Sequence, residues 1–94
     1  MPVYVLLSQL TDEGASTIKE KPERIKEVNQ EIEAFGAHVL HQFATLGSYD
    51  FVSIVEAPDA ASIARVSVEL GSRGSVKIQT LQAIPIEEFI AKLR

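Results

Sequence analysis

The chain has 94 residues, of which 46% are hydrophobic and 23% are charged, and its formal net charge is −4. This length accommodates one small domain, which we expect to span residues 1–94, and the composition is that of an ordinary soluble globule. The densest basic stretch, Lys19–Lys26, is interrupted by Glu20 and Glu23, so a nucleic-acid partner is not expected.

The chain contains no cysteine, which excludes disulfide bonds, thiolate metal sites and cysteine nucleophiles. The apolar run Val3–Leu7 is too short for a membrane span or for the apolar core of a signal peptide. We therefore expect a cytoplasmic protein that has no membrane partner.

The first third of the chain predicts one strand and one helix. Pro2–Leu10 is rich in β-forming residues and is followed by the turn-forming cluster Thr11–Gly14, which predicts a strand and then a long connection that ends at Lys21. Pro22 suits the first turn of a helix, and Gly36 supplies a left-handed stop. Between them one apolar stripe consists of Ile25, Val28, Ile32 and Phe35.

The rest of the chain predicts three more strands and two helices. Ala37–Leu46 and Tyr49–Ala57 are strands, and the Gly47-Ser48 pair between them predicts a tight two-residue hairpin. Asp59 then caps a second helix, and Ser75–Ile84 is the fourth strand. The stripe of the second helix is Ile63, Val66 and Leu70, and Ile86–Arg94 repeats a helical period.

The element order β-α-β-β-α-β is that of a ferredoxin-like α+β fold. This fold has a four-stranded antiparallel sheet in the order 4-1-3-2, with both main helices on one face. Strands one and three are therefore predicted to be central and strands two and four to be edges, with a short C-terminal helix added.

Both central strands are apolar on both faces, although the two helices cover only one. In the first strand Val5 and Leu7 alternate with Tyr4 and Leu6, and in the third strand Val52 and Ile54 oppose Phe51 and Val55. The pattern leaves open which of the two sets faces the helices. A bare face of this kind exceeds the apolar patch that a soluble monomer tolerates. We expect a second copy to pack sheet to sheet; the alternative is that Ile86–Leu93 folds over the same face.

Several short motifs resemble those of the bacterial GYD-domain family. The chain reads Gly47-Ser48-Tyr49-Asp50 at the hairpin and Glu56-Ala57-Pro58-Asp59 at the end of the third strand, with Thr11-Asp12-Glu13-Gly14 and Pro22-Glu23-Arg24 before them. The resemblance covers almost the whole chain. It implies a ferredoxin-like domain of the dimeric α+β barrel type, in which two sheets pack face to face, and it implies no particular reaction.

Tyr49 and Asp50 begin the third strand and are candidate ligand-binding residues, because a phenol and a carboxylate can bind a ligand or exchange protons. The structural interpretation is that Asp50 accepts hydrogen bonds from backbone amides while Tyr49 packs at the end of the sheet. Arg24 lies near the long connection and can pair with a carboxylate ligand. The structural interpretation is an extra helical turn within this connection, with Arg24 in a surface ion pair or bonded to Asp59 or Glu56.

His38 and His41 are the two histidines. Their spacing of three places them on opposite faces of a strand, which argues against a shared metal. His41 would share a face with Val39 and Phe43. A histidine beside apolar neighbours is usually a hydrogen-bonded core or interface residue; the alternative is that His41 transfers protons.

These features favour a small homo-oligomeric protein that binds a small apolar or carboxylate-bearing molecule between helices and sheet. A cofactor-independent enzyme is the alternative, since dimeric α+β barrels include isomerases and monooxygenases; Arg24, His41 and Tyr49 would then be its candidate residues. The third hypothesis is a pure assembly module, with the same space filled by apolar side chains. We expect no metal and no cofactor, because no motif for either is present.

Overall fold

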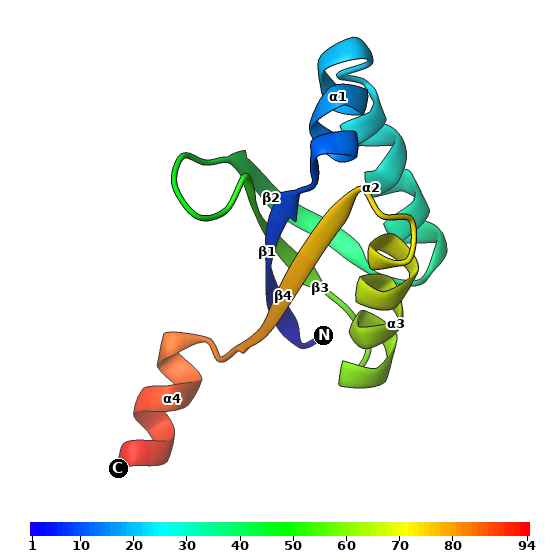
Figure 1. Cartoon of the computed structure of the whole chain (residues 1–94). Coiled ribbons are helices and arrows are strands. Elements are labelled where there is room, and N and C mark those ends of the chain that lie inside the picture. Colours follow the sequence, from blue (N-terminus) through cyan, green and yellow to red (C-terminus); the bar gives the residue numbers. More distant parts are fainter.

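The computed structural model describes all 94 residues and contains one four-stranded antiparallel sheet (Figure 1). Its order, β2-β3-β1-β4, is the predicted order 4-1-3-2 read from the other edge, which confirms the ferredoxin-like arrangement. The strands are β1 (Val3–Leu10), β2 (His38–Ala44), β3 (Phe51–Glu56) and β4 (Val76–Ala83).

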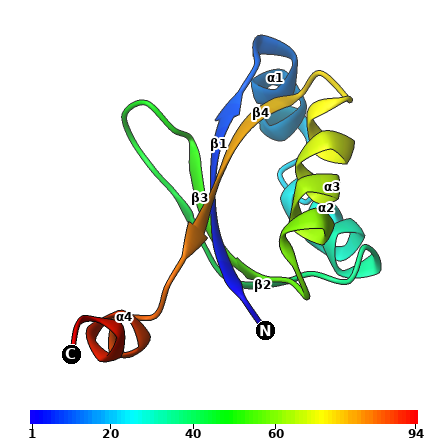
Figure 2. The same cartoon turned by 90° about the horizontal axis from the view of Figure 1, so that it is seen from below.

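Three helices cover one face of the sheet, and a fourth stands away from it. Figure 2 shows α1, α2 and α3 together on one side, while α4 lies on the other side, beyond the end of β4. None of the helices is long and apolar enough to cross a membrane. The helices are α1 (Asp12–Glu20), α2 (Arg24–Ala34), α3 (Ala60–Gly71) and α4 (Ile86–Leu93).

The two main helices form where their stripes and end signals predict them. Asp59 caps α3, since its Oδ1 accepts a hydrogen bond from the backbone N–H of Ser62 at 2.8 Å. Gly36 ends α2 with a φ of 88°, a conformation that costs glycine little. The predicted stripe of α3 is buried throughout: Ile63, Val66 and Leu70.

The core lies between α2, α3 and one face of the central strands. Tyr4 and Leu6 of β1 and Val55 of β3 are at most 3% exposed, and they pack with Ile32 and Val66 of the helices. The sequence left open which alternate set of β3 faces the helices. Because Val55 belongs to the buried set, its neighbours in the strand turn to the uncovered side.

The connection Thr11–Lys21 is largely helix α1, so the prediction of a turn and loop was wrong there. The alternative of an extra helical turn was nearer, although the helix is longer than one turn. Thr11 caps this helix, because its Oγ1 accepts a hydrogen bond from the N–H of Gly14 at 3.1 Å. Asp12 and Glu13 occupy the first turn, where carboxylates are favourable next to the helix N-terminus. A threonine followed by two acidic residues also signals a helix start, and that signal prevails here.

The predicted two-residue hairpin was also wrong. The last residue pair of β2 and β3 is Ala44 with Phe51, and residues 45–50 form the loop between them. The hydroxyl of Thr45 donates to the carbonyl of Tyr49 at 2.7 Å and its backbone N–H donates to the carbonyl of Asp50 at 2.8 Å. Thr45 thus provides hydrogen bonds to two backbone carbonyls within the loop. In a tight turn at Gly47, these carbonyls would have to find their partners in the strand ladder.

Candidate functional site

The side of the sheet opposite α1–α3 is an exposed apolar surface, which we call the open face. Strand pairing aligns its residues in two rows across the sheet. Phe43 remains 58% exposed and Leu81 42% exposed, so this surface lacks a cover within the chain. The rows are His41, Ile54, Val5 and Leu81, and then Phe43, Val52, Leu7 and Gln79.

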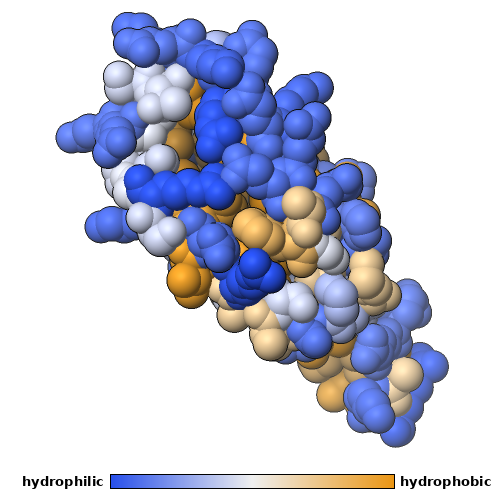
Figure 3. Space-filling view, turned by 90° about the vertical axis from the view of Figure 1, so that its right-hand side faces the viewer, coloured by the Kyte–Doolittle hydropathy of each residue, from blue (hydrophilic) through white to orange (hydrophobic).

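Helix α4 does not fold back over the open face. It stands off the sheet in Figures 1 and 2, and none of its residues is buried. Its own apolar side chains Ile86, Phe89 and Leu93 are 66%, 48% and 71% exposed. The alternative of an internal cover is therefore wrong for the isolated chain. In Figure 3 hydrophilic side chains cover most of the upper part of the helix-bearing side, whereas apolar side chains show in its middle and again toward the bottom, where α4 lies.

A β-bulge at Leu40 changes the predicted placement of the histidines. The pairing of β2 with β3 shifts by one residue between Val39 and His41, so that His38 and His41 pair with residues two apart on β3. By this register both histidines belong to the alternate set of the open face, where His41 joins Phe43. The prediction that they lie on opposite faces was wrong, and so was the placement of Val39 beside His41, since Val39 packs against the core.

The two histidines nevertheless form no metal cluster. The Nδ1 atom of His38 lies 3.3 Å from Oε1 of Glu33, at the end of α2. No group of three or more His, Cys, Asp or Glu side chains is close enough to hold a metal ion.

Tyr49 binds the loop 45–50 to the open face. Its hydroxyl donates a hydrogen bond to Oε1 of Gln79 on β4 at 2.5 Å. In the same loop the carbonyl of Ser48 accepts a hydrogen bond from Nε2 of Gln9 on β1 at 2.6 Å. Two strands thus hold the loop beside the open face, and Figure 2 shows it curling toward that side.

Asp50 ties the start of β3 to the end of β1. Its Oδ2 accepts a hydrogen bond from the N–H of Leu10 at 2.7 Å, and its own N–H donates to the carbonyl of Ser8 at 2.8 Å. Backbone anchoring, the structural interpretation of Asp50, agrees with these contacts. In the Gly-x-Tyr-Asp motif, both the tyrosine and the aspartate therefore join the loop to neighbouring strands.

Arg24 lies on the other side of the sheet, in an ion-pair network between α2 and the turn after α3. Its Nη1 is 3.0 Å from Oε1 of Glu31 and 3.3 Å from Oε1 of Glu27. The other oxygen of Glu31 pairs with Arg73. The hydrogen bond from Arg73 is the main cause that lowers the pKa of Glu31, while desolvation opposes it.

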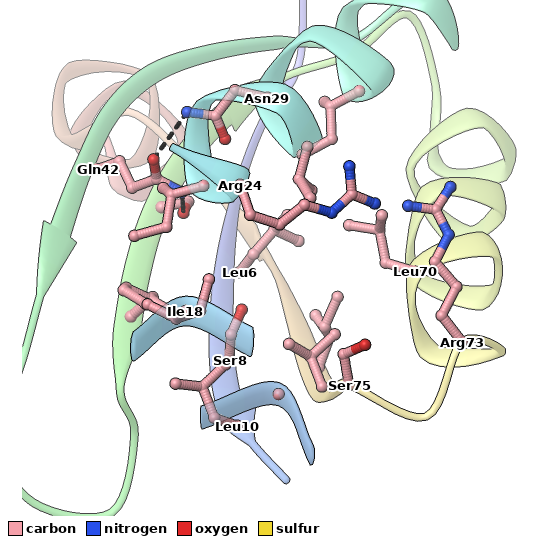
Figure 4. Close-up of a pocket in the computed structure, with 18 of the residues that line it drawn as sticks. Leu6, Ser8, Leu10, Ile18, Arg24, Asn29, Gln42, Leu70, Arg73 and Ser75 are labelled. Carbon is pink, nitrogen blue, oxygen red and sulfur yellow. Dashed lines mark hydrogen bonds between the residues drawn. The ribbon is translucent and has the colours of Figure 1, made fainter. Parts of the chain in front are cut away.

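This network lies at the rim of a cavity of about 120 Å³ between α1, α2, α3 and the sheet (Figure 4). Apolar side chains from the strands and from all three helices form most of its lining. They include Leu6 and Leu10 of β1, Ile18 of α1, Val28 of α2, Leu70 of α3 and Ile78 of β4.

Sequence reasoning missed a chain of polar side chains that reaches this cavity. Nδ2 of Asn29 donates to Oε1 of Gln42 at 2.8 Å, and Nε2 of Gln42 donates to Oγ of Ser53 at 3.1 Å. The Oδ1 atom of Asn29 is buried and has no partner. One signal in the sequence could have indicated it: Asn29 follows Ile25 by four residues and therefore lies on the apolar side of the helix.

The candidate residues therefore do not form one site. His41 and the hydroxyl of Tyr49 lie at the open face, Asp50 lies at the sheet end, and Arg24 lies at the rim of the cavity on the helix side. A site that used Arg24, His41 and Tyr49 together would have to cross the sheet. Their roles in ligand binding remain predictions, and each concerns a different surface.

Comparison with known proteins agrees with this fold. One relative is a protein of Thermus thermophilus that is named glutamine synthetase and cystathionine beta-lyase binding protein. It is 58% identical to this chain over 95 residues, and the alignment covers 100% of both proteins. The crystal structure of TTHA0845, also from Thermus thermophilus, matches with a TM-score of 0.57 and covers 90% of this chain and 95% of that chain. At 20% identity, this likeness concerns the fold alone.

The model of the GYD domain family matches residues 4–93. That range contains the Gly-x-Tyr-Asp motif, the strands that it anchors, and both sides of the sheet. This protein therefore belongs to the GYD domain family.

Proposed function

We propose that this protein is a homo-oligomeric binding protein for enzymes of amino-acid metabolism, with glutamine synthetase and cystathionine β-lyase as the first candidates. The observation that carries the proposal is the 58% identity, over the full length, to a relative named for binding both enzymes. This identity corresponds to about 55 positions, whereas only 11 residues of this chain are buried. Most identical positions therefore lie outside the core, where a partner would make contact.

The exposed area supports the homo-oligomeric part of the proposal. The chain exposes 6299 Å², whereas a folded monomer of 10.3 kDa is expected to expose about 5,400 Å². The excess of roughly 900 Å² is close to the ~800 Å² that each partner loses in a standard protein interface. The open face and α4 hold half of the exposed large apolar residues.

The geometry favours a twofold dimer with its sheets face to face. An isologous contact buries the same surface on both copies, so one interface would cover both open faces. Because α4 stands off the sheet on the same side, its apolar stripe would extend the contact onto the second copy. A cytoplasmic location is part of the same proposal.

The enzyme-binding role is tested with purified glutamine synthetase and cystathionine β-lyase of Thermus thermophilus immobilised on a biosensor. We expect the full chain to bind at least one of them saturably, with the Thermus relative as positive control. Serum albumin serves as a negative control, because an exposed apolar face adheres to many proteins. Equal binding to albumin and to the enzymes, or none to either enzyme, would contradict the proposal.

A further inference from the structure

The cavity under α1, α2 and α3 is separate from the open face and has properties of its own. It measures about 120 Å³, is lined mainly by apolar side chains and opens at the ion-paired rim. Apolar protein cavities of about 150 Å³ take up benzene, so this volume suits a molecule with a single small ring or a short branched chain.

One polar group in the lining lacks a partner. The Asn29–Gln42–Ser53 chain occupies both the amide nitrogen of Asn29 and the carbonyl of Gln42, and leaves Oδ1 of Asn29 buried and free. In Figure 4 this oxygen points away from Gln42, into the space beside Arg24. If both amides are turned over, the nitrogen of Asn29 takes the same place. Either orientation leaves one end of the Asn29 amide for an occupant to satisfy.

The charges at the rim argue against an anionic occupant. Arg24 and Arg73 share Glu31, and Glu27 holds both Arg24 and Lys21, the latter at 2.9 Å. A carboxylate ligand would have to displace Glu31 from two guanidinium groups and would then lie beside that displaced charge. The predicted pairing of Arg24 with a carboxylate-bearing ligand is thus disfavoured by the internal carboxylates.

We propose that this cavity binds a small, neutral, mostly apolar molecule that carries one hydroxyl group, of about the size of phenol. The apolar body fills the space between the helices and the sheet. The hydroxyl bonds to Asn29, and since a hydroxyl both donates and accepts, it fits either orientation of the amide. The site does not overlap the open face, so its failure would leave the proposed enzyme binding unaffected.

The test is an NMR titration of the full ¹⁵N-labelled chain with phenol, toluene and benzoate, three molecules of similar size with different polar groups. We expect phenol to shift amides of α1, α2 and β1 around the cavity. Toluene should bind about tenfold more weakly, the equivalent of one hydrogen bond, and benzoate more weakly still. Equal affinities for phenol and toluene, no phenol-dependent shifts, or shifts confined to the open face and α4 would overturn the proposal.

Three variants assign the contact. Asn29→Leu should weaken phenol about tenfold without weakening toluene, whereas Gln30→Leu, on the exposed side of the same helix, should change neither affinity. Ser8→Leu adds volume to the cavity from β1 and leaves Asn29 in place, so it should abolish both interactions, even if Asn29→Leu fails to fold. The assignment would be contradicted if Asn29→Leu and Ser8→Leu both bound phenol with wild-type affinity. If Asn29→Leu does not fold, wild-type affinity of Ser8→Leu alone would contradict it.

Discussion

Gly14 lies at the closest approach between α1 and the start of β4. A Cβ atom at this position would lie 2.0 Å from the carbonyl oxygen of Ser75 and 2.9 Å from its carbonyl carbon. The same carbonyl accepts a hydrogen bond from the N–H of Thr11 at 3.0 Å, so it cannot move away freely. Gly14 is therefore required by packing, since its backbone has ordinary negative φ.

Gly14→Ala should lower the free energy of unfolding by roughly 2–3 kcal/mol, the cost of forcing atoms into a packed contact. Urea denaturation of the two proteins measures this difference. Gly71→Ala is the matched control, because nothing lies within 4 Å of its added Cβ and alanine favours the end of α3. Equal loss of stability in both variants would show that the Ser75 contact is not the cause.

Glu31 joins α2 to the turn after α3 through Arg24 and Arg73. Its pKa in the folded protein lies below the ordinary value of 4.5, chiefly because of the hydrogen bond from Arg73. A carboxyl group whose pKa is lower in the folded than in the unfolded state stabilises the fold at pH values above its unfolded-state pKa. This stabilisation is lost as the pH falls through the folded-state pKa.

Glu31→Gln should therefore reduce stability at pH 7, by about 0.5 kcal/mol because the pair is partly exposed. The difference from the wild type should shrink as the pH falls below 4.5. Urea denaturation at a series of pH values tests both statements. Glu20→Gln, at an exposed site on α1, is the control; a gap for Glu31→Gln that is constant with pH would contradict the ion-pair explanation.

At the scale of elements, α1 depends on its N-cap residue, Thr11. Thr11 accepts a hydrogen bond from Gly14 and donates one to the carbonyl of Gly74 at 2.7 Å, so it caps the helix and also fastens it to the turn before β4. A helix of this length is marginal without such contacts.

Thr11→Val should destabilise α1 locally by about 1 kcal/mol, the usual value of a side-chain cap. We expect faster hydrogen exchange at the amides of α1 while those of α3 change little. Thr17→Val is the matched control, because the Thr17 hydroxyl bonds only to the carbonyl of Glu13 within the same helix. Similar exchange in both variants would show that Thr11 does not hold the helix.

The sequence predicted the elements whose signals are local and repeated. The stripe of α2, the cap at Asp59 and the alternation in β1 depend on spacing alone, and the sheet order follows from them. The predicted loop in place of α1 and the predicted two-residue hairpin were wrong, because threonine and glycine occur both in turns and at helix ends. There the choice depends on contacts with Ser75 and with β1, which are far away in the sequence.

The candidate site was harder to predict, for a related reason. One extra residue at Leu40 moves every later side chain of β2 to the other face, and spacing alone cannot reveal a bulge. The polar chain from Asn29 through Gln42 to Ser53 joins three separate elements. Each member looks like an isolated polar residue in its own segment, so only the fold shows that they meet.

As a whole, the molecule is longer than its residue number suggests. Its radius of gyration is 14.1 Å, whereas a compact chain of this size is expected to have about 12 Å, and its longest dimension is 51 Å. The projecting α4 accounts for this length (Figure 1). An apolar helix held away from its own domain is expected to pack against a second molecule.

Ile54→Glu should separate the oligomer into monomers, because it places a charge at the centre of the open face. Light scattering after gel filtration should show the mass falling to that of a single 10.3 kDa chain. Val68→Glu introduces the same charge at an exposed position of α3, where no interface is proposed, and should leave the mass unchanged. A wild-type protein that is already monomeric at micromolar concentration would contradict the proposed dimer.

The bulge at Leu40 also limits how copies of this chain can join. It lies on β2, an outer strand of the sheet, where it interrupts the regular spacing of backbone N–H and C=O groups. A strand from another molecule needs that regular spacing to extend the sheet sideways. At the opposite border, β4 bears Lys77 and is followed by Pro85, which has no N–H to donate. Concentrated solutions should therefore contain closed particles of fixed size, and fibrils should not form.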